Sequence, residues 1–543
     1  MSEVVILPLL VALATAIVTL GIRFAPRLQR AVSVGGALAY AVAVGLLATR
    51  VLPDAVFSSE TVADAGTILT YQLSGWQAPY GITLVADSLS VFMLAIAAIV
   101  AVAAAVFSTK YVDEIGQSVS YHPLFHFMLV GISGSFLTGD IFNLFVWFEV
   151  MLMPSYILVV FNGGEKHTDA ALKYTALNLM GSAVMLLAIG GLYSTTGTLN
   201  MADLSMRLSN AGAEGAAISD PTPVLGLAAL LLAVFALKAG IVPFQFWVPS
   251  AYKAAPAPAT AMLAGVTKKV GVYAIIRLYF VVFAAGTLPQ DLAIPGLSGT
   301  SFLAFFGPVL FVLATASVLV GGVGAVSRPD LDGLFAYSSI GQVGFIVLPL
   351  GIAATVTDPA IVALGVVAAL VYSLNHALAK TLLFLLSGSI EQSIGSVRFD
   401  DLGGLTRAQP LAAASFFVGG LALVGIPPLT GFFGKLLVFD TAGRAMAAGA
   451  SSAWLGLAVA LVGAILTIAY VSRAWSLGFW GDPSELIANM RLSPQLLGVV
   501  VALAVVIVAL GVGFDPVLES ARAGAQAATD PAAYREAVLE VEA

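Results

Sequence analysis

Ionisable side chains interrupt five long apolar stretches of this sequence: Glu149; Lys238; Lys268 and Lys269; His376 and Lys380; and Lys435. A charged side chain at the centre of a bilayer costs at least about 2.5 kcal/mol on insertion scales. Carboxyl, amine and imidazole groups can also take up and release protons when their surroundings change. Other apolar stretches carry no charge, so this clustering predicts a buried path for protons. A structural ion pair is the alternative for Glu149 and Lys238.

Prolines interrupt two of these stretches. Pro243 follows Lys238 by five residues, and Pro427 and Pro428 precede Lys435 in "LVGIPPLTGFFGKLLVF". A proline removes a backbone hydrogen bond, and non-helical backbone at membrane depth is tolerated where it lines a cavity or is buried in protein. Broken helices in corresponding positions of two halves indicate repeats with an ion path between them. The offset of five helices makes these repeats inverted.

The spacing of the remaining ionisable residues predicts which of them share a face. His376 and Lys380 are four residues apart and therefore lie on one face of a helix. Lys268 and Lys269 are adjacent, so we expect only one of them to face the path. Burial raises the pKa of a carboxyl group and lowers that of a lysine, whereas an opposite charge nearby shifts each pKa in the reverse direction. Such a pair forms a coupled proton switch.

Several other ionisable residues are secondary candidates. Asp87 opens the third apolar stretch and belongs either to the path or to a simple helix start. Asp140 precedes Glu149 by nine residues, and Lys173 lies in a loop. The secondary candidates are thus Asp87, Asp140, Lys173 and Lys268. His122 and His126 have a spacing that can bind metal, but without a nearby carboxylate or cysteine we expect interfacial residues and no metal site.

The composition sets the class of protein. Of 543 residues, 59% are hydrophobic and 10% are charged, whereas soluble domains carry about 25% charged residues. The sequence therefore predicts an all-α polytopic membrane protein. About fourteen apolar stretches are long enough to span hydrocarbon: 4–22, 31–51, 81–107, 121–139, 141–161, 170–194, 223–248, 255–281, 303–325, 331–354, 359–390, 410–438, 453–478 and 494–514.

The spans divide the chain into four predicted regions: 1–120 with helices one to three, 121–281 as the first repeat, 303–478 as the second repeat, and 494–543 with the last helix and a tail. Lysine and arginine are more numerous in alternate loops, starting with Arg23, Arg27 and Arg30. The positive-inside rule places those loops in the cytoplasm. We therefore expect an uncleaved first helix and both termini outside the membrane of a bacterial cell.

Several motifs together resemble one known family. They are "DIFNLFVWFEV", "ALKAGIVPFQFWVPSAYKAAPAPATAMLAGVTKKVGVYAIIRL", "FAYSSIGQVGF" and "NHALAKTLLFL". The chain resembles the antiporter-like subunits shared by respiratory complex I and the Mrp-type multisubunit Na+/H+ antiporters. The resemblance covers roughly 81–480 and implies fourteen core helices, two inverted five-helix repeats, and breaks in helices seven and twelve.

The resemblance also implies roles for individual residues. Those that match the family's central hydrophilic axis are Glu149 on helix five, Lys238 on helix seven, Lys269 on helix eight, His376 and Lys380 on helix eleven, and Lys435 on helix twelve. Lys269 is preferred over Lys268 because it fits the family pattern of lysine, any residue, glycine, any residue, tyrosine. The helix-twelve position is lysine in some members and glutamate in others.

The resemblance leaves two functions open. One is a non-enzymatic, proton-translocating subunit of a Na+(Li+)/H+ antiporter, with membrane partners resembling the Mrp A, B, C, E, F and G proteins. The other is a proton-pumping subunit of a complex I-like NADH:quinone oxidoreductase. A substrate-binding permease is disfavoured because the buried charges form a line and not one pocket. The chain has no cysteine, no phosphate loop and no dinucleotide motif, so we expect no cofactor.

Overall fold

The computed structural model describes residues 2–57, 66–118, 120–288, 301–450 and 452–539. Ten helices in this part of the chain are long and apolar enough to cross a membrane. They are α2 Pro26–Val51, α3 Ser88–Tyr111, α6 Ile141–Val160, α7 Glu165–Thr196, α9 Thr222–Ala239, α13 Phe302–Val326, α14 Leu331–Ala353, α15 Pro359–Ile394, α19 Ala453–Ala474 continued by the π-helical turn η7 Trp475–Phe479, and α21 Pro494–Val512.

Shorter or interrupted helices occupy the other four predicted spans. They are α1 Leu7–Gly21; α5 Tyr121–Leu137; the run of α11 Ala257–Met262, η4 Leu263–Thr267, α12 Lys268–Ile276 and η5 Arg277–Val282; and the pair α17 Pro410–Val424 and α18 Thr430–Ala447. The predicted all-α membrane architecture is confirmed. The second broken span continues to Ala447, beyond its predicted end at 438, because α18 is helical throughout.

The two repeats begin their second helix in the same way. Asp140 caps the start of α6 and Asp330 caps the start of α14, each by accepting a backbone N–H three residues on. Each aspartate also forms an isolated antiparallel bridge to the segment after the repeat's third helix, Asp140 with Asn200 and Asp330 with Arg398. An equivalent connection at both positions supports the predicted internal repeat. The repeats run in opposite directions because α6 and α14 start at opposite ends of the bundle.

Each repeat has its break in its fourth helix. The first break separates α9 from α10 Trp247–Ala254, and the second separates α17 from α18. In both, a glycine in the left-handed region ends the first half: Gly240 at φ +66° and Gly425 at φ +89°. A glycine after a helix is favoured there because it lacks the Cβ that makes this conformation costly. Pro243 and the pair Pro427–Pro428 follow within the interruptions, as predicted.

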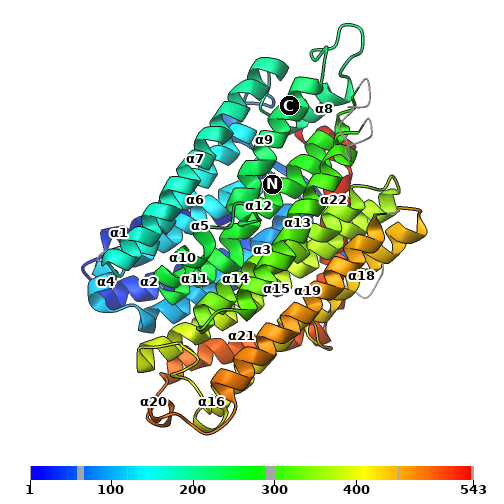
Figure 1. Cartoon of the computed structure of the whole chain (residues 1–543). Helices are drawn as coiled ribbons and strands as arrows, with labels where there is room; N and C mark the ends of the chain where they lie inside the picture. Colours follow the sequence, from blue (N-terminus) through cyan, green and yellow to red (C-terminus); the bar gives the residue numbers. More distant parts are fainter. Residues whose placement is uncertain (1, 58–65, 119, 289–300, 451, 540–543) are drawn as a thin grey trace.

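Short elements cover the two ends of the bundle. They are η1 Ser2–Val4, η2 Asp54–Val56, η3 Leu73–Gly75, η6 Phe283–Ala285, α4 Glu114–Ser118, α8 Met201–Ser209, α16 Leu405–Ala408, α20 Glu485–Ala488, and the hairpin of β1 Leu69–Gln72 with β2 Thr83–Ala86. The third helix was predicted from 81 and begins at Ser88 instead, since 83–86 pair with β1. Figure 1 shows α8 at one end of the long helices and α16 and α20 at the other.

The tail after α21 is helical, with α22 Asp515–Thr529 packed on α3 and α15. The next helix, α23 Pro531–Leu539, packs on α8, β1 and η5, and η1 at the other terminus also contacts β1. Both ends of the chain therefore lie at one end of the bundle, which we call the termini face. Residues 540–543 of the predicted tail and residues 58–65 lie outside the described residues.

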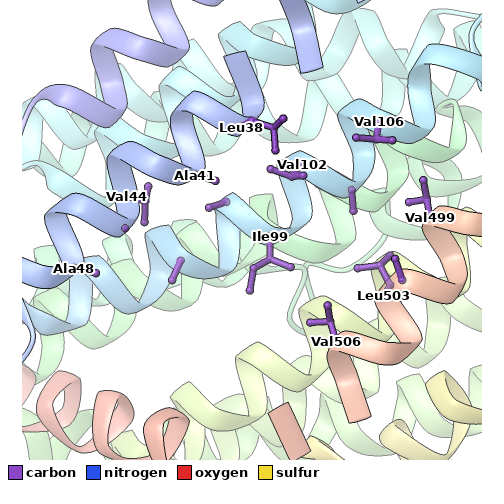
Figure 2. A pocket seen from close by; sticks show the side chains of 15 residues that line it. Leu38, Ala41, Val44, Ala48, Ile99, Val102, Val106, Val499, Leu503 and Val506 are labelled. Atoms are coloured by element: carbon purple, nitrogen blue, oxygen red, sulfur yellow. The ribbon is translucent and has the colours of Figure 1, made fainter. Parts of the chain in front are cut away.

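A large pocket lies at the edge of the bundle and is apolar. It encloses about 580 Å³ between α2, α3 and α21. Figure 2 shows its labelled lining residues, all of them alanine, valine, leucine or isoleucine. These side chains offer no donor, acceptor or charge to an ion, so the pocket is unsuited to ion transport.

Candidate functional site

Glu149 and Lys238 are joined through a third residue. The Ser182 hydroxyl on α7 donates to Glu149 Oε1 on α6. Lys238 Nζ on α9 lies 3.1 Å from Ser182 Oγ and 3.3 Å from the Asn178 carbonyl oxygen. Within the described residues no direct ion pair links Glu149 and Lys238. The predicted carboxyl–amine pair is thus a hydroxyl-bridged pair, with Lys238 only 3% exposed.

Ser182→Ala removes this bridge and leaves both ionisable groups in place. We expect the rate of ion exchange by the assembled protein to fall about tenfold, because a hydrogen bond to a charged group is worth roughly 1.5–3 kcal/mol. Ser155→Ala is a matched control: it also removes a buried hydroxyl, one that bonds Leu152 O and the Tyr174 hydroxyl. Equal rates in wild type and Ser182→Ala would contradict the bridging role.

Polar groups from other helices satisfy the backbone freed at the first break. The Trp247 indole N–H donates to Leu237 O at 2.9 Å, and the Ser317 hydroxyl on α13 accepts the Val242 N–H at 2.9 Å. A β-carbon at Gly240 would lie 3.1 Å from Lys268 Cε. Protein groups therefore satisfy these two backbone atoms on the inner side of the break, where Lys268 lies against Gly240, while Pro243 and Phe246 are exposed on its outer side.

Both adjacent lysines of α12 lie in the interior, which corrects the expectation that only one would face the path. Lys268 and Lys269 are fully buried. Lys268 Nζ lies 3.3 Å from Ser339 O, whereas Lys269 Nζ lies 2.7 Å from Ala264 O and 2.5 Å from His376 Nδ1. The π-helical turn η4 immediately precedes them. Lys268 faces the first break and α14, while Lys269 faces α15.

His376 and Lys380 lie one turn apart on α15, as predicted, and both are fully buried. Lys380 Nζ donates to Phe335 O at 3.0 Å and to the Ser338 hydroxyl, both on α14. Its ammonium also lies over the Phe335 ring at 5.6 Å, a favourable cation–π distance. Backbone oxygen, hydroxyl and aromatic face therefore replace the water that a lysine normally requires.

Lys435 lies at the second break. Its ammonium donates to Val424 O, the last carbonyl of α17, at 2.9 Å, and lies 5.1 Å from the Phe345 ring centroid. With 4% exposure it is buried in protein. Its side chain therefore does not reach the surface of the bundle.

A cluster of uncharged polar side chains lies between α14, α15 and α19. The Gln342 amide donates to the Tyr470 hydroxyl at 2.7 Å and to Thr467 Oγ1 at 3.3 Å. The Tyr372 hydroxyl donates to the Gln342 carbonyl oxygen, and the Tyr372 ring stacks on Phe345, over which Lys435 lies. These residues occupy the space between Lys380 and Lys435.

Together these groups form a row of polar and ionisable side chains through both repeats, all of them buried except Glu149, which is partly exposed at the start of the row. Hydrogen bonds join Glu149, Ser182 and Lys238 at one end and Lys269 and His376 in the middle. Lys268 precedes Lys269 beside the first break, Lys380 lies one turn after His376, and Gln342 and Lys435 complete the row. Amine, imidazole and carboxyl groups can each bind and release a proton, and hydroxyl groups can pass one on. The arrangement is suited to moving protons laterally through the membrane interior.

The structure gives the secondary candidates other positions. Asp140 caps α6, and Lys173 forms an exposed ion pair with Asp169 at 2.7 Å, away from the row. Asp87 caps α3 and pairs with Arg277. His122 and His126, expected at the interface, are fully buried in α5; His126 Nε2 lies 2.9 Å from Ser33 Oγ on α2.

Sequence reasoning missed Ser182, Ser338, Gln342 and Arg277. Serine and glutamine carry no charge, so their presence in an apolar helix gives little signal. Arg277 is charged, but it stands near the end of its apolar stretch, where a long side chain can reach the membrane surface. In the structure it is 1% exposed. The spacing Lys269, Tyr273, Arg277, with steps of four residues, was the available signal.

Comparisons with known proteins all identify the same family. Residues 138–467 match the family described as NADH:quinone oxidoreductase/Mrp antiporter, TM. The D subunit of the Na(+)/H(+) antiporter of Alkalihalophilus pseudofirmus is 33% identical over 543 residues, covering 99% of this chain and 100% of that protein. The N subunit of the NADH-quinone oxidoreductase of Desulforudis audaxviator is 33% identical over 470 residues, covering 86% and 85%.

A solved structure shares the fold over the whole chain. A chain of the Mrp complex from Dietzia sp. DQ12-45-1b superposes with a TM-score of 0.83 at 28% identity, covering 99% of this chain and 100% of that chain. The similarity extends through the C-terminal tail, which carries none of the motifs recognised in the sequence.

Proposed function

Because the chain belongs to the membrane-subunit family of NADH:quinone oxidoreductases and Mrp antiporters, we propose that it is the proton-translocating subunit of a multisubunit Na+(Li+)/H+ antiporter, corresponding to the D subunit of the Mrp type. The observation that carries the proposal is the row of titratable side chains, buried from Lys238 onward, which passes through both repeats and both helix breaks. Its partners are the other membrane subunits of such a complex. Sodium export is assigned to the complex as a whole.

The antiporter is favoured over a complex I-like oxidoreductase by how far the relatives match. The antiporter relative aligns over its entire length, whereas the oxidoreductase relative aligns over 85% of its own. We assign the chain no enzymatic step. We place it in the inner membrane of a bacterial cell, with the termini face outside, because basic residues concentrate in the opposite loops.

The mechanism follows from the bridged pair. While Glu149 is a carboxylate, the Ser182 hydroxyl points to it and the Lys238 ammonium is stabilised by the nearby negative charge. When Glu149 takes up a proton, that charge disappears and Lys238 becomes a better proton donor. Lys268, at the adjacent break, is the next acceptor, and the proton continues through Lys269, His376 and Lys380 to Lys435. Each transfer changes the charge that faces the next group.

Lys238→Ala tests this function directly. We expect membrane vesicles containing the complete complex to lose Na+- and Li+-dependent proton exchange, measured with a fluorescent pH probe, while the complex still co-purifies. Lys173→Ala removes an exposed lysine that pairs only with Asp169, and it should retain the wild-type rate. Normal exchange by Lys238→Ala would end the proposal that this row carries the protons.

A further inference from the structure

A second line of polar residues leaves the row at Lys269. Lys269, Tyr273 and Arg277 are spaced four residues apart, so they share one face of the α12 helix and the π-helical turn η5 that continues it. The Tyr273 hydroxyl donates to Phe136 O at 2.8 Å, and Arg277 Nε donates to the Tyr273 hydroxyl at 3.2 Å. Lys269 lies one turn before Tyr273 on this face, and from Tyr273 the hydrogen-bonded line runs towards the termini face.

An enclosed ion pair ends this line. Arg277 Nη1 lies 2.7 Å from Asp87 Oδ2, and Nη2 lies 2.7 Å from Oδ1, with each side chain 1% exposed. Nη2 also lies 3.2 Å from Ser90 Oγ, which in turn lies 3.3 Å from the Tyr273 hydroxyl. Capping α3 requires only one carboxylate oxygen, which accepts the Ser90 N–H at 2.9 Å. The bidentate ion pair with a buried arginine is not needed for capping the helix.

The C-terminal tail covers the ion pair. Tyr534 of α23 is fully buried, and its ring lies 5.0 Å from Arg277 Cζ, while Tyr273 approaches the same guanidinium at 5.4 Å. The arginine is therefore held between one tyrosine of the bundle and one of the tail. The preceding helix α22 packs on α3, which carries Asp87, and on α15, which carries His376. The tail thus separates the end of the line from water at the termini face.

We propose that Lys269, Tyr273, Ser90 and Asp87 form a side branch of the proton row that opens at the termini face, and that the tail is its built-in closure. The proposal rests on the proposed function. The Lys269 ammonium turns from His376 towards the Tyr273 hydroxyl, one helical turn away, and gives it a proton. The Tyr273 hydroxyl turns from Phe136 O to Ser90 and passes its own proton through Ser90 to the Asp87 carboxylate. Neutral Asp87 no longer holds Arg277 by charge. Once Tyr534 moves away, the Asp87 carboxyl releases the proton to water and the ion pair re-forms.

Accessibility of Ser90 tests the closure without measuring transport. The chain has no cysteine, so Ser90→Cys introduces a single thiol into it. In the complete complex we expect slow labelling by a membrane-impermeant maleimide from either side. Adding Tyr534→Ala should speed labelling from the termini side about tenfold, since a desolvated cation–π contact is lost. Tyr534→Phe, which keeps the ring, should leave labelling slow, and Ser209→Cys at an exposed position of α8 should label equally in every background.

Proton leak tests the branch itself. Vesicles with Tyr534→Ala should leak protons in the absence of Na+, and adding Asp87→Asn or Lys269→Met should abolish that leak. A leak that survives Asp87→Asn, or Ser90 labelling that is unchanged by Tyr534→Ala, would overturn the branch and its closure. Neither readout needs antiport. If Lys238→Ala abolishes exchange but Tyr534→Ala does not change the labelling, the branch alone is refuted. If Lys238→Ala exchanges ions normally but Tyr534→Ala speeds the labelling, the proposed function alone is refuted.

Discussion

Replacing Glu149 by glutamine is expected to reduce Na+/H+ exchange by the complete complex to the background of vesicles without it. The glutamine carbonyl can still accept the Ser182 hydroxyl, so the local geometry is preserved and the complex should assemble. The amide cannot bind and release a proton, however, so Lys238 never receives the change of charge that triggers its own release. Exchange is measured from the pH change inside vesicles after Na+ or Li+ addition, and assembly by co-purification.

Asp140→Asn provides the matched control. Asp140 precedes Glu149 on the same helix and acts there as the N-cap, accepting the Asn143 N–H at 2.7 Å. Asparagine caps helices about as well as aspartate, so exchange should remain at the wild-type rate. If Glu149→Gln exchanges ions normally, Glu149 has only a packing role and the start of the row lies elsewhere.

Lys380→Arg is expected to be as inactive as Lys380→Met. Lys380 is the amine that follows His376 in the row, and it is fully buried beside Phe335 O and the Ser338 hydroxyl. A guanidinium keeps the positive charge but does not lose its proton in proteins. If Lys380 only balanced charge or held α14 to α15, arginine would restore function where methionine does not. The rates of Na+-dependent proton exchange in the three proteins decide between these roles.

The surface lysine Lys166 is the control for the arginine and the methionine substitutions at Lys380. It stands at the start of α7 on the surface, and its replacement by methionine or arginine should not alter exchange. Substantial exchange in Lys380→Arg would show that the charge at this position matters and that its proton does not. The row would then need another route from His376 to Lys435.

The broken helices and the buried amines were predictable because their costs are local. A proline or a lysine in an apolar helix is expensive wherever it lies, and so each signals a special environment without knowledge of the fold. Lys238, Lys269, His376, Lys380 and Lys435 all lie in the interior for that reason, and Glu149 is partly exposed. The predicted spans agree with the helices to within a few residues, with three exceptions: 83–86 pair as a strand, α9 already ends at Ala239, and α18 continues to Ala447.

The connections between these groups were not predictable in the same way. Ser182 and Ser338 gain their roles only because α7 and α14 bring them to Glu149 and Lys380. Lys268 was set aside by assuming that one helix face alone meets the path. The break after α9 and the body of α14 meet that helix at Lys268, whereas α15 meets it at Lys269. Contacts between helices depend on packing, which a local pattern does not specify.

The hydroxyl bridge between Glu149 and Lys238 has a consequence for the direction of transport. A serine hydroxyl both donates and accepts, and rotation about one bond exchanges the two roles. The same holds for the Ser338 and Tyr372 hydroxyls farther along. Connections of this kind conduct equally well in either sense and cannot rectify a current. The concentration gradients of H+ and Na+ across the membrane, and not the hydrogen bonds within this chain, therefore decide which way the exchanger runs.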